Sequence, residues 1–327
     1  MKALITGSSG FIGSYLRNSL SRDGITIVGF DQYCENEQTA SYECIVGDIK
    51  EKEKLLKAVQ SVDIVIHLIA MHHDFGIPES EYFDVNEKGT QNLLSCCSEA
   101  GVKKFIFVSS VAVYGTRSEP TDENTLPTPD TPYGRSKLAA EKVVAKWAQE
   151  DPTRQVIIIR PTVIFGPKNY ANVYNLIDQI YHRRFIFVGD GSNIKSVAYV
   201  ENLVEATRFL LCRMKSGVDI YNYVDEKQMT TKQIVEIVSR LLSVPIPKIK
   251  IPLWLTAGFG SIFDLLGKIT GYNFPITGKR IKKFCTETYH NADKIRALSF
   301  QQPVSLDEGF KRTIAWYLES RQRSTMT

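Results

Sequence analysis

Tyr133 and Lys137 are four residues apart in the segment PYGRSK, which opens a run with the apolar spacing of a helix. Residues at this spacing project from one helix face, so the phenol and the ammonium would lie side by side. A nearby ammonium favours the phenolate and lowers the pKa of a tyrosine from about 10 towards neutrality. Tyr133 is therefore a candidate general base or acid for interconverting an alcohol and a ketone. Ser110 can hydrogen-bond the same substrate oxygen, although a Tyr–Lys pair alone also occurs on ordinary helix surfaces.

A glycine-rich turn near the start of the chain offers a place for a dinucleotide. It joins Ala3–Ile5, an apolar run typical of a buried strand, to Phe11–Leu20, which has the spacing of a helix face. Gly7 allows the turn, Gly10 lets the backbone approach a pyrophosphate, and Gly13 lets the helix pack closely on the strand. The free N–H groups of the helix N-terminus would face the phosphates. The expected cofactor contacts here are Gly7, Gly10, Phe11 and Ile12.

Asp31 ends the second apolar strand, Ile25–Phe30, about 20 residues after the glycines. A carboxylate at this place can hydrogen-bond both ribose hydroxyls of an adenosine and would repel a 2′-phosphate. No arginine follows in Gln32–Gln38 to receive such a phosphate. The sequence therefore predicts NAD rather than NADP, and the alternative is a surface aspartate at a strand end.

Further strands are expected at Tyr42–Val46, Asp63–Leu68 and Lys103–Ser109, with helices at Glu51–Val59 and Tyr82–Ala100 between them. This alternation predicts a parallel sheet covered on both faces, that is, an α/β fold with a Rossmann-type doubly wound sheet. A ligand should then lie outside the carboxyl ends of the strands.

Two of these strand ends carry further candidate contacts. Asp48 can reach the adenine amine, with Ile49 against the adenine face. Ile69, Ala70 and Met71 would line the cofactor after the fourth strand. The adjacent His72, His73 and Asp74 suggest a metal site, but neighbouring side chains in an extended segment point to opposite sides and no third ligand is evident, so no metal is expected.

These segments together resemble the extended short-chain dehydrogenase/reductase superfamily, in particular the NAD-dependent epimerase/dehydratase family of nucleotide-sugar enzymes. The matching pieces, in order, are TGSSGFIG, Asp31, GDI at Gly47–Ile49, HLIA at His67–Ala70, Asn86, SSVAVYG at Ser109–Gly115, PYGRSKLAAE at Pro132–Glu141, RPTVIFGP at Arg160–Pro167 and GDGSNIKSVAYVENLVEA at Gly189–Ala206. The resemblance implies NAD as cofactor and Ser110, Tyr133 and Lys137 as the catalytic triad. It also implies cofactor contacts for Asn86, Ser109, Tyr133, Lys137, Pro161 and Val163.

Departures from the family pattern narrow the expected reaction. The family's 4,6-dehydratases carry acidic residues directly after the catalytic Ser or Thr, where this chain has Val111 and Ala112. Dehydration is therefore not expected. The remaining candidates are 4-epimerisation of a nucleotide-diphosphate sugar, which we expect, and reduction of a 4-keto sugar by NADH or NADPH. Val163 stands where the 4-epimerases usually have an asparagine that touches the substrate, so plain UDP-galactose epimerase activity is doubtful.

The second half is expected to contact the substrate. Asn172 begins a helical segment that would lie over the sugar nucleotide, Lys195 falls where family members commonly place an arginine on the diphosphate, and Arg280 is a candidate second phosphate contact. The apolar passage Ile251–Ile269 is expected to be a lid or a helix of a substrate domain, with interfacial membrane contact as the alternative. If Trp254–Leu266 bound a lipophilic substrate instead, the protein would be a hydroxysteroid-type dehydrogenase.

Length and composition fit these expectations. The 327 residues allow a cofactor domain at 1–168, whose sheet also receives segments near 196–224, and a substrate domain at 169–327. The net charge of +4 is mild and scattered, so no nucleic-acid partner is expected. Six cysteines without CxxC spacing suggest reduced thiols in a cytoplasmic protein. The resemblance further suggests a homodimer formed through Tyr82–Ala100 and Pro132–Trp147.

Overall fold

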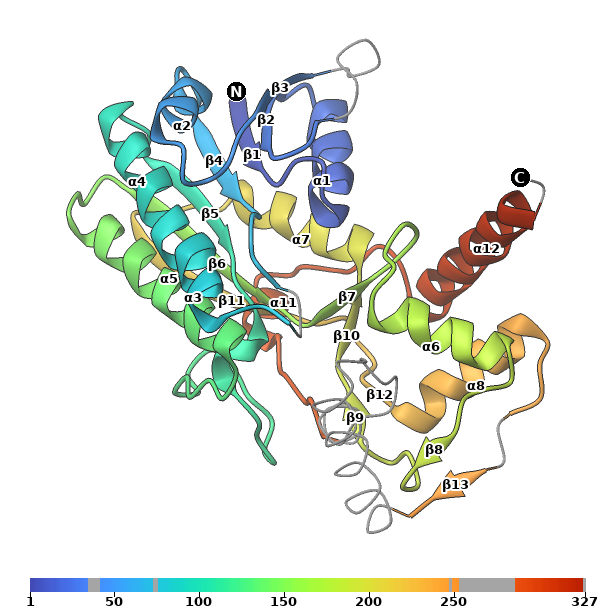
Figure 1. Ribbon diagram of the computed structural model, residues 1–327. Coiled ribbons are helices and arrows are strands. Elements are labelled where there is room, and N and C mark those ends of the chain that lie inside the picture. Colours follow the sequence, from blue (N-terminus) through green and yellow to red (C-terminus); the bar gives the residue numbers. More distant parts are fainter. Residues whose placement is uncertain (35–41, 73–75, 247–248, 253–285, 326–327) are drawn as a thin grey trace.

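The computed structural model describes residues 1–34, 42–72, 76–246, 249–252 and 286–325. Its centre is a seven-stranded parallel sheet with the strand order β11-β6-β5-β4-β1-β2-β3 (Figure 1). The strands are β1 (Lys2–Thr6), β2 (Thr26–Asp31), β3 (Glu43–Val46), β4 (Ile64–His67), β5 (Lys104–Val108), β6 (Gln155–Pro161) and β11 (Gly217–Tyr223). The chain runs outward from β1 in one direction and then from β4 in the other, which creates a switch point between β1 and β4 where ligands bind in such sheets. The expected doubly wound fold is confirmed.

Helices cover both faces of this sheet because its strands are apolar on both faces. Along β5, Phe105 and Phe107 pack on one side and Ile106 on the other. The first side is covered by α2 (Lys52–Val59), α4 (Gly89–Glu99) and α5 (Pro132–Gln149), and the second by α1 (Phe11–Arg22), α7 (Val200–Leu211) and α11 (Asp293–Ala297). The sheet is thus buried between two helical layers, as parallel sheets require.

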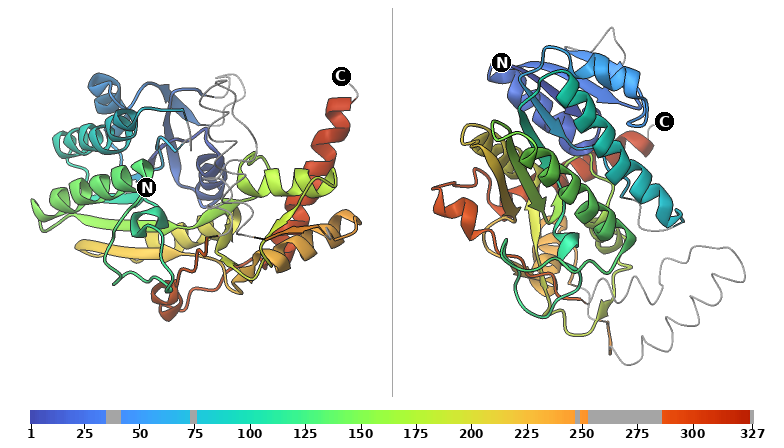
Figure 2. Two further views of the ribbon diagram at one scale, coloured as in Figure 1. Left: turned by 60° about the horizontal axis from the view of Figure 1, so that its bottom comes forward. Right: turned by 90° about the vertical axis from the view of Figure 1, so that its left-hand side faces the viewer.

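A smaller lobe with its own core lies beside the sheet (Figures 1 and 2). Its helices are α6 (Asn172–Tyr181), α8 (Thr231–Leu242) and α12 (Leu306–Thr325). Its short strands pair as β7 (Val163–Phe165) with β10 (Val197–Tyr199), β8 (Phe187–Val188) with β13 (Lys250–Ile251), and β9 (Ile194–Lys195) with β12 (Met229–Thr230). The division of the chain at residues 168 and 169 stays a prediction. No helix in the described part of the chain combines the length and apolar character needed to cross a bilayer.

Three local features refine the sequence expectations. The helix expected at Tyr82–Ala100 consists of α3 (Glu79–Phe83), the π-helical turn η1 (Asp84–Lys88) and α4. The last helix, α12, continues close to the C-terminus, as far as Thr325. Thr230 caps α8, because its hydroxyl accepts the Gln233 N–H and the Gln233 side chain accepts the Thr230 N–H.

The cysteines also depart from the expectation of reduced thiols. Cys34, three residues after Asp31, forms a disulfide with Cys44 on β3. Sequence spacing could not reveal this pair, because it depends on how β2 and β3 are brought together in the sheet. Among the other described cysteines, Cys96 and Cys97 are buried thiols and Cys212 is an exposed one.

Asp225, just after β11, fastens the sheet to the start of α7. Its carboxylate accepts hydrogen bonds from the Tyr199 N–H (2.9 Å), the Asn202 amide (2.8 Å) and the Tyr223 hydroxyl (3.1 Å). Asn202 in turn holds Val304 through its N–H (2.9 Å) and its carbonyl (2.7 Å). Burial raises the pKa of the Asp225 carboxyl to about 7, although these hydrogen bonds oppose the rise.

The raised pKa of Asp225 predicts a pH-dependent stability difference. The folded protein holds a proton here between about pH 4 and pH 7 that the unfolded chain releases, so stability falls as pH rises through this range. In Asp225→Asn the side chain does not titrate: its carbonyl oxygen can accept the Tyr199 and Asn202 N–H groups, and its NH2 group can donate to the Tyr223 hydroxyl oxygen. The free energy of unfolding is measured in urea from pH 4 to 8. The difference between variant and wild type should shift in favour of the variant by a few kcal/mol between about pH 4 and pH 7, and should stay constant above pH 7. Parallel pH curves for the two proteins would contradict this.

Candidate active site

The glycine-rich turn lies at the switch point between β1 and β4. Gly7 has a φ of +73°, and its N–H donates to the Phe30 carbonyl at the end of β2 (2.7 Å). A side chain at Gly7 would press on the backbone of Leu68 and Ile69, and one at Gly13 would overlap the Gly7 carbonyl. These close approaches require glycine and leave the first turn of α1 facing the carboxyl edge of the sheet.

Asp31 is fixed at the edge of this turn. One of its carboxylate oxygens accepts the Ser9 N–H (3.0 Å) and the other accepts the Gln32 N–H (2.8 Å). The Gln32 side-chain amide donates to Asp48 (3.2 Å), so Gln32 joins the two acidic residues predicted to hold an adenosine, one through its backbone and the other through its side chain. The Ile49 side chain is only 2% exposed and packs on Gly89 of α4. The predicted contact of Ile49 with an adenine face stays a prediction.

The segment after β4 is held from below by Asn86. The Asn86 amide accepts the Met71 N–H (2.7 Å) and donates to the Met71 carbonyl (3.0 Å) and to Ser136 of α5 (2.8 Å). The Asn86 side chain is 1% exposed, and its predicted contact with the cofactor stays a prediction. Asn86 positions Met71. Ile69, Ala70 and Met71 are partly exposed at the strand end, and their contact with the cofactor stays a prediction.

The predicted triad is assembled where α5 meets the end of β5. Ser110 begins the short 3-10 helix η2 (Val111–Tyr114), and its hydroxyl accepts the Ala112 N–H (3.1 Å). A Cβ at Gly134 would overlap the Ala112 carbonyl, so this glycine lets α5 approach η2 closely. Tyr133 is the neighbouring residue, in the first turn of α5, and Thr131 caps that turn by accepting the Gly134 N–H (3.0 Å). Ser110 and Tyr133 are thereby carried on two elements in direct contact.

Lys137 lies one turn further along α5 and is 1% exposed. Its ammonium donates to the Val108 carbonyl (2.8 Å) and lies 4.2 Å from the centre of the Phe107 ring. Burial lowers the pKa of Lys137 to about 7, against an opposing effect of Glu141. Beneath it His67 bridges Thr6 (2.6 Å) and Thr90 (3.0 Å), and burial followed by the Lys137 charge lowers the pKa of His67 to about 3.

Glu141, one turn beyond Lys137, is bound by the Arg160 guanidinium in a two-pronged ion pair of 2.9 and 2.6 Å, and both side chains are buried. Arg160 also donates to the Tyr114 hydroxyl (2.8 Å), which donates to Asn222 on β11 (2.7 Å). This network joins α5, β6, η2 and β11 below the triad. The fork of Arg160 satisfies both carboxylate oxygens, which a lysine could not do.

Other predicted site residues are spread around the same edge. Ser109 directly follows β5 and Pro161 ends the neighbouring strand β6, and the buried Ser109 hydroxyl has no hydrogen-bond partner within the described residues. Val163 on β7 is partly exposed and Asn172 is the exposed first residue of α6. The Lys195 ammonium on β9 donates to the Thr286 carbonyl. Arg280, His73, Asp74 and all but the first two residues of 251–269 lie outside the described residues.

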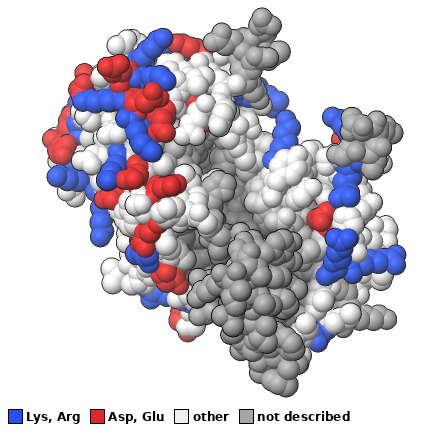
Figure 3. All heavy atoms as spheres, viewed as in Figure 1, with Lys and Arg blue, Asp and Glu red and all other residues white. Residues whose placement is uncertain are grey.

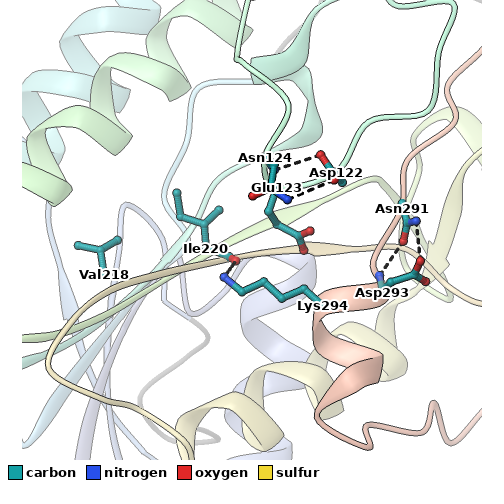
Figure 4. A pocket seen from close by; sticks show the side chains of 8 residues that line it. All are labelled: Asp122, Glu123, Asn124, Val218, Ile220, Asn291, Asp293 and Lys294. Carbon is teal, nitrogen blue, oxygen red and sulfur yellow. Dashed lines mark hydrogen bonds between the residues drawn. The ribbon is translucent and has the colours of Figure 1, made fainter.

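Space for a ligand is visible in two places. Figure 3 shows the surface hollowed between the two lobes, with acidic and basic side chains interspersed over the larger one. A separate open cavity of about 610 Å³ lies beside the edge strand β11 (Figure 4). There Glu123 accepts the Asn222 N–H (2.7 Å) and Lys294 donates to the Ile220 carbonyl (2.8 Å), so charged side chains cap the strand's outer edge. None of the predicted site residues lines this cavity.

Comparison with known families identifies this arrangement. The family model described as "NAD dependent epimerase/dehydratase family" matches residues 3–223. The chain belongs to this family. It is thus an NAD-dependent enzyme of the extended short-chain dehydrogenase/reductase type, as expected from the sequence.

Individual relatives differ in their reactions. The chain is 39% identical over 327 residues to N-acetyl-alpha-D-glucosaminyl-diphospho-ditrans,octacis-undecaprenol 4-epimerase of Escherichia coli O157:H7, covering 99% of this chain and 97% of that protein. It is 30% identical over 338 residues to human dTDP-D-glucose 4,6-dehydratase, covering 98% and 90%. The solved structure of MoeE5 in complex with UDP-glucose and NAD matches with a TM-score of 0.78 at 24% identity, covering 98% and 100%, which establishes likeness of fold.

The residues present fit NAD. The glycine cradle, the first turn of α1 and Asp31 at the end of β2 provide the three parts of a dinucleotide site. The cofactor is expected to be held by these elements, by Ile69–Met71 and by Lys137. Within the described residues no three His, Cys, Asp or Glu side chains gather as metal ligands.

Sequence reasoning missed the supports of this site. Gly134 and Thr131 set the start of α5, and the Glu141–Arg160 pair lies below it. The capping residue Thr131, three residues before Gly134, could have indicated where α5 starts. The i,i+4 spacing of Lys137 and Glu141 could have indicated that Glu141 lies on the same helix face as Lys137. Nothing in the sequence pairs Glu141 with Arg160, because the pair forms only when β6 lies against α5.

The Glu141–Arg160 pair predicts a strong coupling in stability. Arg160→Met leaves a buried carboxylate without a partner and should cost about 3–5 kcal/mol in the free energy of urea unfolding. The double variant Glu141→Leu/Arg160→Met removes both charges and should recover most of that loss. The exposed pair Arg135–Glu79 (2.8 Å) is a matched control, where Arg135→Met should cost less than about 1 kcal/mol. Equal costs at the two sites would contradict the assignment.

Proposed function

We propose that this protein is an NAD-dependent 4-epimerase of a sugar attached to a diphosphate carrier, with Tyr133 as the catalytic base. The main support for this proposal is the close contact between η2 and α5. Ser110 lies at the start of η2, Tyr133 lies in the first turn of α5, and Lys137 lies one turn further along α5. The 39% identity to a 4-epimerase along nearly the whole chain supports the same reaction class.

In the proposed mechanism, the Tyr133 phenolate takes the proton of the C4 hydroxyl and the Ser110 hydroxyl hydrogen-bonds the same oxygen. Lys137, one turn along α5 from Tyr133, would favour the phenolate when its ammonium is charged. Bound NAD supplies the acceptance and return of a hydride at C4. After the keto sugar has rotated in the site to present its other face, Tyr133 returns the proton to the oxygen of the inverted centre.

Elimination of water has no proton donor in the turn that follows Ser110. Val111 and Ala112 occupy the first two positions of η2, and neither carries a group that could protonate a leaving hydroxyl. Although the chain is 30% identical to a 4,6-dehydratase, we therefore do not propose dehydration. Reduction of a 4-keto sugar by NADH or NADPH needs the same triad and is the second candidate.

The carrier can be a nucleoside diphosphate or a polyprenyl diphosphate. The sequence resemblance favours a nucleotide sugar, whereas the 39% identical relative is named for a polyprenyl diphosphate substrate. Both carriers present a diphosphate, and Lys195 on β9 and Arg280 are the proposed contacts for it. Asn172 at the start of α6 is the proposed contact on the sugar side. A homodimer through α4 and α5 and a cytoplasmic location are part of the proposal.

The reaction is tested with UDP-, dTDP-, GDP- and polyprenyl-diphosphate sugars, with and without NADH or NADPH. Interconversion of C4 epimers without added reductant is expected, because the cofactor is regenerated in each turnover. Consumption of reduced cofactor only with a keto sugar would establish the reductase instead. Activity confined to hydroxysteroids would refute both.

Tyr133→Phe removes the proposed base and little else. Its turnover should fall about 10³-fold, since general acid–base catalysis contributes roughly 10²–10⁴. The amount of NAD bound, measured after denaturing the purified protein, should stay unchanged. Tyr170→Phe, an exposed tyrosine on the smaller lobe, is the control and should keep full activity. A Tyr133→Phe enzyme with more than a tenth of wild-type turnover would rule out this base.

Asp31 should set the cofactor preference. The wild type is expected to bind NAD at least tenfold more tightly than NADP, a ratio that corresponds to about 1.4 kcal/mol. Asp31→Asn removes the charge that repels a 2′-phosphate and should narrow the ratio, as measured by calorimetric titration. Asp48→Asn should change the affinities for both cofactors alike. A wild-type preference for NADP would overturn the assignment.

A further inference from the structure

The far end of the smaller lobe is a two-stranded ribbon with isoleucines on its outer side. In this ribbon, β8 pairs in parallel with β13, Phe187 opposite Lys250 and Val188 opposite Ile251 (Figure 1). The Phe187 N–H also donates to the Ile249 carbonyl (3.1 Å). The register therefore places Ile186 and Ile249 on neighbouring positions of the two chains.

The alternation along this ribbon directs Ile186 away from the core. Phe185 and Phe187 are 5% and 3% exposed and belong to the core of the smaller lobe, whereas Ile186 between them is 36% exposed. Ile249 is 65% exposed, and Ile246, three residues earlier, is 48% exposed. Three large aliphatic side chains are thus exposed, two on the paired chains of the ribbon and one just before β13.

Basic side chains accompany these isoleucines. Arg183 and Arg184 leave the end of α6 directly before β8, and Lys250 is the first residue of β13; all three are exposed. No ion pair joins either arginine to another described residue. Asp190 is the acidic neighbour, and its carboxylate is engaged by the Ser192 N–H (2.9 Å) and hydroxyl (2.7 Å). On the face seen in Figure 3 the smaller lobe carries more basic than acidic side chains.

We propose that Arg183, Arg184, Ile186, Ile246, Ile249 and Lys250, here called the ribbon tip, form a docking surface for an anionic phospholipid bilayer. Exposed aliphatic side chains can enter the headgroup boundary while guanidinium and ammonium groups meet lipid phosphates, and membrane attachment at an interface depends on both contributions. Neither contribution is expected to suffice alone, so the pairing of the two in one ribbon distinguishes this surface from single exposed isoleucines.

The position of the ribbon tip connects it to the substrate. A short loop leads from β8 to β9, which carries Lys195, and α6, which begins at Asn172, leads into Arg183. Docking would therefore bring the elements with the proposed substrate contacts to the bilayer surface. This use of the surface rests on the proposed function with a polyprenyl diphosphate as carrier, whose chain lies in the membrane.

Vesicle binding by the full-length protein tests the docking surface directly. Sucrose-loaded vesicles of phosphatidylethanolamine and phosphatidylglycerol are sedimented with the protein at 0.1 and 0.5 M salt, next to vesicles of phosphatidylcholine. We expect binding to the anionic vesicles, weakening at high salt, and at least tenfold weaker binding to phosphatidylcholine. Absence of binding to the anionic vesicles overturns the proposal.

Matched variants distinguish binding through the ribbon tip from nonspecific binding of the protein to vesicles. Ile186→Ser/Ile249→Ser and Arg183→Glu/Arg184→Glu should each lower the vesicle affinity at least tenfold without changing the melting temperature. The controls Leu126→Ser, at a side chain 75% exposed, and Arg213→Glu/Lys215→Glu, at exposed positions after α7, should bind like the wild type. Equal losses in controls and tip variants overturn the proposal. So does a change of oligomeric state in Ile186→Ser/Ile249→Ser, seen by sedimentation velocity, because it assigns the tip to a second copy of the chain.

The same variants keep this test distinct from that of the epimerase. The tip variants should retain turnover on a water-soluble diphosphate sugar and lose at least tenfold on a polyprenyl-diphosphate sugar presented in anionic vesicles. Tyr133→Phe should lose turnover and still bind vesicles. An inactive wild-type protein that binds vesicles refutes the proposed function alone, and an active one that fails to bind them refutes the docking surface alone.

Discussion

The close contact between α5 and η2 is the constraint on which the candidate site depends. A side chain at residue 134 would overlap the Ala112 carbonyl, so any other residue would push the first turn of α5 away from the end of β5. Ser110 belongs to one of these elements and Tyr133 to the other. Their approach is thus set by backbone against backbone, which leaves little freedom for the spacing between hydroxyl and phenol to vary.

Below this contact the protein keeps several polar groups out of water, and each is treated differently. Lys137 is buried with one carbonyl partner, so the cost of its charge appears as a lowered pKa. His67 is held neutral between two threonine hydroxyls. Arg160 and Glu141 remain charged because each satisfies the other. Burying these polar groups lowers the stability of the fold. The fold tolerates this loss because the surrounding sheet and helices are extensively packed.

The sequence predicted the strands, the glycine turn, Asp31 and the family because these depend on local patterns in β1, α1 and α5. It could not show which partners a residue meets when those partners lie on distant segments. Ile49 follows Asp48 in a motif that suggests a ligand contact, and only the fold shows that its side chain also packs on Gly89 of α4. Asn86 belongs to the family pattern, but only the fold shows that Met71 and Ser136 use its hydrogen-bonding groups. The Cys34–Cys44 pair likewise depends on the alignment of β2 with β3.

The seventh strand of the sheet comes late in the chain. β11 pairs with β6 over its whole length, but the elements from β7 to α7 are made between them, and several of these belong to the smaller lobe. During synthesis β6 therefore has no partner strand on its outer edge until residue 223 has left the ribosome. A nascent chain at that stage exposes the apolar strand Gln155–Pro161 to other unfinished chains, a condition that favours intermolecular strand pairing. The order of elements thus makes the timing of translation a factor in the yield of folded enzyme.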